Sequence, residues 1–89
     1  MDFRWNDWNI EHVQKHGVTP KEAERVVRAA RPPFPERRDE DKWRVVGRGD
    51  GGRLVQVIFV EDADGVTAYI IHARPLTDRE KRVYRRRIR

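Results

Sequence analysis

The chain has 89 residues, 39% of them charged, with a formal net charge of +5 and no Cys. This length allows a single domain, expected over residues 1–89, and excludes a multidomain enzyme. Without Cys the chain lacks the disulfides that small secreted domains usually carry, and no apolar run approaches the roughly 20 residues of a membrane span. We therefore expect a cytoplasmic protein without a signal peptide.

Two helices are predicted in the first third of the chain. A short strand over Phe3–Trp5 precedes Asn6, a good N-cap, and the helix that follows is expected to end near His16. The second helix has the stronger signal, because residues 19–22 (Thr-Pro-Lys-Glu) have the pattern of a capping box with Pro at the first helical position. Its apolar residues fall on one stripe, and Pro32 ends it: Ala23, Val26, Val27 and Ala30.

Three strands and a last helix are predicted after an irregular segment over residues 31–41. The strands cover Lys42–Arg48, Arg53–Glu61 and Val66–Arg74, and the short turns between them contain Gly and Asp, which is typical of antiparallel hairpins. The middle strand is apolar on both faces, so we expect it at the centre of the sheet, covered by helices on one side. A second capping box, Thr77–Glu80, opens a C-terminal helix.

The predicted fold is α+β with the order β-α-α-β-β-β-α, in which two helices pack on one face of an antiparallel sheet and the C-terminal helix is basic. Residues 79–89 carry a net charge of +6, whereas the other 78 residues sum to −1. Sixteen of the twenty cationic side chains are Arg, which binds phosphate through a bidentate fork and stacks on bases. This pattern favours a nucleic-acid partner. A basic segment that binds an acidic protein, or that only keeps the chain soluble, is the alternative.

Several segments occur together in a fixed order over nearly the whole chain: Trp5, Lys15–Thr19, Glu22–Ala23, Gly52–Leu54, Ile71–Glu80 and Tyr84–Arg86. This set resembles the BrnT family, the toxins of type II toxin–antitoxin systems, which are related to the RelE/ParE superfamily. The chain departs from the commonest family pattern at His72, where many members have Ser.

The resemblance implies a RelE/ParE-like fold and a metal-independent ribonuclease that needs no cofactor, similar to an mRNA interferase. It also implies a cognate antitoxin of the BrnA type, with a ribbon-helix-helix domain that neutralises the toxin. The complex of the two proteins would bind operator DNA through the antitoxin and repress its own operon.

RNA cleavage without a metal needs a base for the 2′-OH, an acid for the 5′-oxygen and cations that stabilise the phosphorane. His72 and Arg74 are expected on one face of the last strand, the face that also carries Ile70, at the end next to the basic helix. We predict His72 and His16 as the proton-transfer groups and Arg74 and Arg53 as the catalytic cations. The alternative is a partly buried His72 and an Arg74 that pairs with a carboxylate.

The predicted substrate-binding residues come from three parts of the chain: Lys15, Arg48, Arg79, Tyr84, Arg85 and Arg86. Arg48 and Arg53 are expected to lie nearly opposite each other in a hairpin, where an anion would relieve their repulsion; solvated side chains that splay apart are the alternative. The helix dipole alone can explain Lys15 and His16 in the last turn of the first helix, and core packing can explain Tyr84. His12 and His16 have a spacing that suits zinc, but no third ligand is evident, so we predict no metal site.

These inferences predict a toxin that cleaves RNA, and they leave two alternatives open. The first is a non-enzymatic toxin fold that only binds an antitoxin and modulates its grip on operator DNA. The second is a stand-alone RNA-binding protein without an antitoxin. A neighbouring gene for a ribbon-helix-helix protein is expected for both toxin interpretations, and arrest of growth only for the enzyme.

Overall fold

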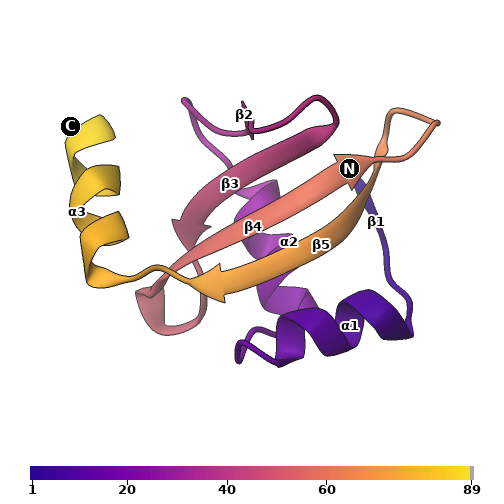
Figure 1. Cartoon of the computed structure of the whole chain (residues 1–89), viewed down its shortest axis with the longest axis horizontal. Helices are drawn as coiled ribbons and strands as arrows, with labels where there is room; N and C mark the ends of the chain where they lie inside the picture. The colour runs from indigo at the N-terminus through magenta and orange to yellow at the C-terminus, as the bar shows by residue number, and fades with distance from the viewer. Residues whose placement is uncertain (89) are drawn as a thin grey trace.

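The computed structural model describes residues 1–88 and shows an α+β fold in which a five-stranded sheet is combined with three helices (Figure 1). Within these residues, no helix is long and apolar enough to cross a membrane. The elements are, in chain order, β1 (Asp2–Arg4), α1 (Asp7–Gln14), α2 (Pro20–Arg28), β2 (Glu36–Arg37), β3 (Lys42–Arg48), the short 3-10 helix η1 (Asp50–Gly52), β4 (Leu54–Glu61), β5 (Thr67–Pro75) and α3 (Asp78–Arg87).

The sheet has the strand order β1-β5-β4-β3-β2, with β4 in the centre as the sequence predicts. Strands β2 to β5 are antiparallel to their neighbours, but β1 is parallel to β5, so the prediction of a wholly antiparallel sheet is wrong at this edge. The turns that indicate hairpins concern only strands that follow each other in the chain. They carry no information about β1 and β5, which come from opposite ends of it.

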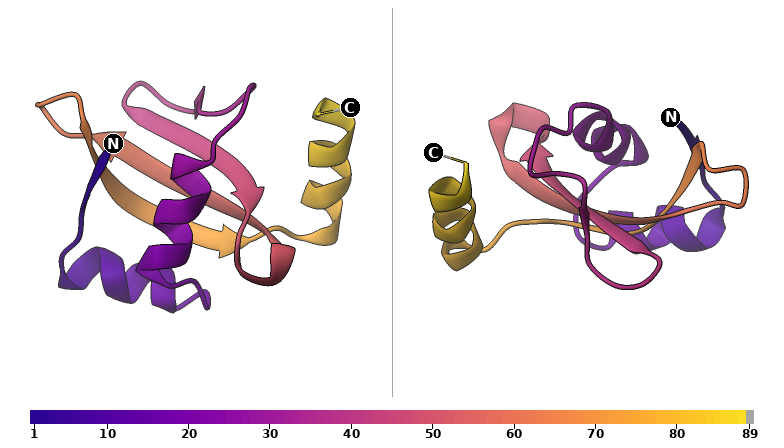
Figure 2. Two further views of the ribbon diagram at one scale, coloured as in Figure 1. Left: turned by 180° about the vertical axis from the view of Figure 1, so that it is seen from behind. Right: turned by 90° about the horizontal axis from the view of Figure 1, so that it is seen from above.

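Helix α2 covers one face of the sheet and forms the core with it (Figure 2). Its N-cap Thr19 accepts a hydrogen bond from the Glu22 amide at 3.1 Å, as predicted. The second half of the predicted capping box is absent, because the Glu22 side chain is bonded to Arg53 and Asp50 instead. The β4 residues on this face are fully buried: Val55, Val57 and Phe59.

Helix α1 lies along the outer edge of β5, beyond the end of β1, and not beside α2 on the covered face (Figures 1 and 2). The expected packing of both helices on one face is therefore correct for α2 only. Asn9 explains the position of α1, because its amide nitrogen donates to the Ile70 carbonyl on this edge at 2.9 Å. The side chain thus satisfies a backbone acceptor of β5 next to the three-residue strand β1.

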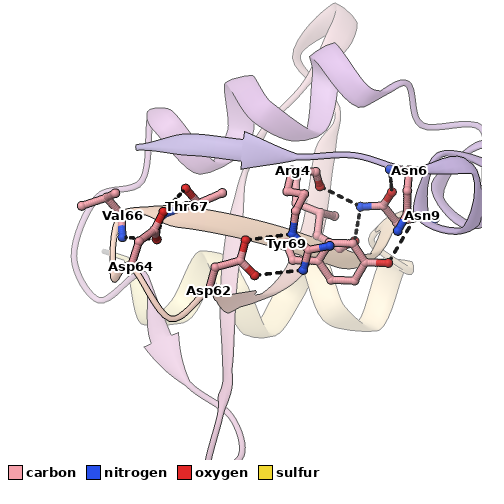
Figure 3. A network of polar contacts seen from close by, with 9 residues as sticks. Arg4, Asn6, Asn9, Asp62, Asp64, Val66, Thr67 and Tyr69 are labelled. Atoms are coloured by element: carbon pink, nitrogen blue, oxygen red, sulfur yellow. Dashed lines mark hydrogen bonds and ion pairs between the residues drawn. The ribbon is translucent and has the colours of Figure 1, made fainter.

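A network of polar contacts attaches the start of α1 to β5 (Figure 3). Asn6 and Asn9 form a reciprocal capping box, and the Tyr69 hydroxyl donates to Asn6 Oδ1 at 3.3 Å. The Arg4 guanidinium lies 4.0 Å from the centre of the Tyr69 ring and donates two hydrogen bonds to Asp62, at 2.8 and 2.9 Å. These contacts hold the Tyr69 ring in one orientation beside α1.

The face of the sheet opposite α2, called the open face below, carries the polar side chains of the inner strands. A β-bulge in β5, opposite Ile58 and Phe59 of β4, determines which β5 side chains lie on the open face. Phe59 pairs with Ile70 on the core side, whereas Ile58 pairs with His72 on the open face. Ile71 is the additional residue, so Ile70 and His72 point to opposite faces. The prediction that they share a face is wrong for this reason.

Helix α3 lies at one end of the open face (Figure 2). It contacts the sheet through few side chains and has no fully buried residue. Tyr84 of α3 stacks on the buried Phe34 ring, with 6.0 Å between the ring centroids. Thr77 and Glu80 form the predicted capping box at its start, with both reciprocal hydrogen bonds present.

Candidate functional site

Three histidines from two parts of the chain meet beside the open face. His12 lies in the last turn of α1 and His16 lies just beyond its C-cap Lys15, and their rings are 6.1 and 5.2 Å from the ring of His72 on β5. Because α1 follows the edge of β5, the i, i+4 spacing places both rings next to the strand. Burial, together with the positive charge that His16 and Arg74 can carry, lowers the pKa of His72 below its ordinary value. The neutral form of His72, which can accept a proton, is therefore favoured.

Arg74 lies on the same face as His72, two residues further along β5. It donates two hydrogen bonds to Glu80 in the first turn of α3, both at 2.7 Å. These bonds, with the Thr77 amide as a further donor, lower the pKa of Glu80 to about 2. The structure thus brings His16, His72 and Arg74 to one side of the sheet, and it also shows the carboxylate pairing of Arg74 that the sequence left as an alternative.

A second group of polar residues on the open face was not predicted from the sequence. Arg44 on β3 donates to Gln56 at 2.7 Å and to Glu36 at 2.8 Å, and Arg87 of α3 donates to the same Glu36 at 2.7 Å. Pairing of β3 with β4 places Arg44 and Gln56 on one face of the sheet. The alternation of side chains along the predicted hairpin could therefore have indicated that these two residues lie together. Glu36 lies in the segment that was expected to be irregular, so no periodic pattern indicated it.

A shallow depression lies between these groups and contains four Arg and two Glu side chains. Arg38 is one of them, and its positive charge contributes to the lowered pKa of His72. The open face is therefore net positive at this depression, next to the histidines. The residues that line it are Glu36, Arg37, Arg38, Arg44, Gln56, Arg74 and Glu80.

Arg53 does not join this group. Its guanidinium donates to the buried Glu22 carboxylate of α2, at 2.6 and 3.0 Å, and to the Gly17 carbonyl at 2.8 Å. Arg53 thus lies on the side of the sheet that α2 covers, whereas Arg74 lies on the open face. The expectation that both guanidinium groups surround one phosphate is wrong. Arg53 bonds to α2 on the covered face, whereas Arg74 pairs in register with Gln56, whose side chain lies on the open face.

Arg48 and Arg53 also do not face each other across the β3–β4 hairpin. Arg48 pairs with Leu54, and the Arg53 carbonyl accepts a hydrogen bond from the Gly49 amide, so the register is shifted by one residue from the expected one. Arg48 donates to the Gly52 carbonyl at 3.0 Å. No anion is needed to relieve repulsion between the two side chains.

The other predicted substrate-binding residues lie at the two ends of the open face. Lys15 is the exposed C-cap of α1, next to His16. Tyr84 is half-buried against Phe34, which is the packing role that the sequence allowed. Arg89, the last residue of the basic segment, lies outside the described residues. The cations of α3 that are exposed within residues 78–87 include Arg79, Arg85 and Arg86.

The arrangement on the open face can bind a polyanion and transfer protons at one of its phosphates. The described part of the chain, residues 1–88, contains no set of three ligating side chains grouped for a metal ion, although three histidine rings lie close together. A pair of histidines beside arginine is sufficient for acid–base chemistry on a phosphodiester. A search with models of protein families gives no match to this chain, and a search of curated proteins gives none either.

Proposed function

We propose that the protein is a BrnT-like toxin of a type II toxin–antitoxin system, with a RelE/ParE-like fold, and that it cleaves RNA on its open face without a metal. One observation carries this proposal: His16 and His72 approach to 5.2 Å between ring centroids, on the same face as Arg74. His16 follows an edge helix and His72 lies on an inner strand, on the side of the sheet opposite α2. The cytoplasm is the proposed location.

In this proposal His72 is the general base and His16 the general acid. Neutral His72 takes the proton of the 2′-OH, and the 2′-oxygen attacks the phosphorus atom. The bond from phosphorus to the 5′-oxygen then breaks, and protonated His16 gives its proton to that oxygen. The products are a 2′,3′-cyclic phosphate and a 5′-hydroxyl. Each proton transfer contributes about 10²–10⁴-fold to the rate.

Arginine stabilises the negative charge of the phosphorane in the same proposal. Arg74 is the nearest candidate, since it already points along the open face, and an RNA phosphate would compete with Glu80 for its donors. Arg38 is a second cation near His72. Preorganised donors of this kind contribute about 3–4 kcal/mol to transition-state stabilisation.

The exposed apolar residues of α3 support a protein partner. Val83 of α3 and its C-cap Ile88 are 45% and 47% exposed, and this short helix contacts the rest of the fold through few side chains. We propose that the antitoxin, a ribbon-helix-helix protein, covers this helix and the adjoining open face, and that the complex binds operator DNA through the antitoxin. This surface also favours the second candidate function, a toxin fold that binds an antitoxin without cleaving RNA.

Cleavage of a labelled single-stranded RNA by the purified protein in the presence of EDTA tests the enzymatic proposal. Wild-type protein is expected to produce cyclic phosphate ends. His72→Gln and His16→Gln are each expected to lower the rate by about 10²–10⁴-fold. Arg28→Ala, which removes an exposed cation from α2 on the other side of the sheet, is the control and retains the wild-type rate.

Two results would contradict the ribonuclease. One is an intact RNA after incubation with folded wild-type protein, and the other is undiminished cleavage by His72→Gln. Expression in cells without the antitoxin separates the two toxin functions. Arrest of growth by wild type but not by His72→Gln supports the enzyme, whereas harmless expression of both supports the non-enzymatic binding module.

A further inference from the structure

An exposed aromatic surface adjoins the histidine cluster and has no role in the mechanism above. Trp8 lies in the first turn of α1, and 55% of its surface is exposed. Its ring is stacked on His12, with 4.8 Å between the centroids and 11° between the planes. The Tyr69 ring lies 6.4 Å away at 19°. Trp5 and Trp43, the other two indoles of the chain, pack against the core.

The aromatic surface is held in place before any ligand binds. Tyr69 is fixed by its hydrogen bond to Asn6 and by the Arg4 guanidinium that lies over its ring (Figure 3). Trp8 and His12 are one turn apart on a helix whose N-terminus has a complete capping box. A flat surface that is already ordered loses little conformational entropy when it binds a flat ligand.

The surface leads directly to the proposed reaction centre. Trp8 and His12 lie one turn apart on α1, and His16 follows four residues later, just beyond the C-cap, with its ring closer to His72 than the ring of His12. A single strand that places a phosphate between His16 and His72 can therefore place a neighbouring base near Trp8. Asp7 and Glu11, both exposed on the same helix, disfavour a phosphate at this end, so a base fits there better than the backbone of the strand.

We propose that Trp8, backed by His12, stacks on an unpaired base of single-stranded nucleic acid and so positions the nucleotide that flanks the scissile phosphate. The position of that phosphate rests on the proposed function, whereas the stacking itself does not. Aromatic side chains stack on every base, so the contact selects single strands over duplexes, whose bases are already stacked and paired. It adds little sequence preference.

Binding of a fluorescein-labelled oligothymidylate, which the enzyme cannot cleave, tests the proposal by fluorescence anisotropy. Trp8→Ala is expected to raise the dissociation constant by about 5- to 100-fold, and Trp8→Phe, which keeps an aromatic ring, by much less. Val66→Ala, which shortens an exposed apolar side chain in the turn just before β5, is the control and leaves binding unchanged. Thermal unfolding of each variant verifies that it is folded.

An oligomer of the same length with abasic sites separates stacking from charge. Wild type is expected to bind it more weakly than oligothymidylate, and Trp8→Ala is expected to have no further effect on it. As a second readout, oligothymidylate is expected to quench the intrinsic Trp fluorescence of wild type, and this quenching is lost in Trp8→Phe. This quenching test compares wild type with Trp8→Phe, so it can be made even if Trp8→Ala does not fold.

Unchanged oligothymidylate affinity of Trp8→Ala, or an equal loss of affinity for the abasic oligomer, would overturn the stacking role. Failure of the ribonuclease is a different result. If RNA stays intact while oligothymidylate binding still depends on Trp8, the proposed catalysis is wrong and the base-binding surface stands. If RNA is cleaved at the wild-type rate by Trp8→Ala and its affinity is unchanged, only the stacking proposal is wrong.

Discussion

Replacement of Arg53 by Ala is expected to destabilise the fold and to leave the chemistry of the open face in place. The Glu22 carboxylate is fully buried and accepts three hydrogen bonds, two from Arg53 at 2.6 and 3.0 Å and one from the Asp50 amide at 2.7 Å. Without Arg53, one carboxylate oxygen loses its partner and the other keeps only the amide. The variant therefore leaves a buried negative charge without its counter-ion.

The size of the effect follows from burial on the two sides of the pair. Removal of one partner from a buried ion pair costs about 3–5 kcal/mol. The Arg53 side chain is 39% exposed, so water can replace part of what it supplies. We expect the free energy of unfolding to fall by about 2–3 kcal/mol. For a domain of this size, this corresponds to a decrease in Tm of roughly 10–20 °C.

Thermal and urea denaturation of Arg53→Ala, followed by circular dichroism, measures this loss. Arg25→Ala breaks the exposed pair with Asp50 and is the matched control, with an expected cost of less than about 1 kcal/mol. The pair with Arg53 lowers the pKa of Glu22, so its stabilisation is present above the ordinary carboxyl pKa and is lost as the pH falls below it. This acid dependence should be weaker in Arg53→Ala. A variant with wild-type Tm that no longer binds or cleaves RNA would refute the structural role.

Two further substitutions test other contacts, and a third is the control for the second. Arg74 and the helix cap lower the pKa of Glu80 to about 2, so the stability of wild type should fall by about 2 kcal/mol between pH 4.5 and pH 2. Glu80→Gln removes this carboxylate. In urea denaturation across that pH range, the stability of the variant should therefore change less with pH than that of wild type. Gly49→Ala would press its added carbon against the Glu22 carboxylate and is expected to cost about 1–3 kcal/mol in the same assay at pH 7. At Gly47 an added carbon would lie at an ordinary contact distance from its neighbours, so Gly47→Ala should change stability by less than about 1 kcal/mol. Equal effects at the two glycines would contradict this expectation and show that the Glu22 carboxylate moves away from the added carbon.

Local signals predict the elements of this fold well. Thr77 and Glu80 make the expected capping box, and the strand that is apolar on both faces is the central one. At Thr19 the cap is correct, but the Glu22 side chain contributes to an ion pair with Arg53 instead of closing the box. A capping box depends on residues within one turn, whereas this ion pair depends on how α2 lies on β4.

The face of each site residue was harder to predict, because it depends on register. One additional residue at Ile71 reverses the alternation of β5, so His72 is separated from Ile70 by a bulge that has no clear sequence signal. The proximity of His16 to His72 follows from the edge position of α1, which Asn9 fixes by a bond to backbone distant in sequence. Sequence patterns within a single segment indicate neither the bulge at Ile71 nor the edge position of α1.

The two outermost strands restrict how this protein can associate with others. β1 has three residues and β2 has two, and α1 occupies much of the remaining border of β5. β2 pairs only with Trp43 and Arg44, so the longest border open to a foreign strand is the short stretch of residues 45–48 of β3. Growth of the sheet across molecules is therefore limited to short pairings. This arrangement favours association through side chains, above or below the strands, or through the last helix.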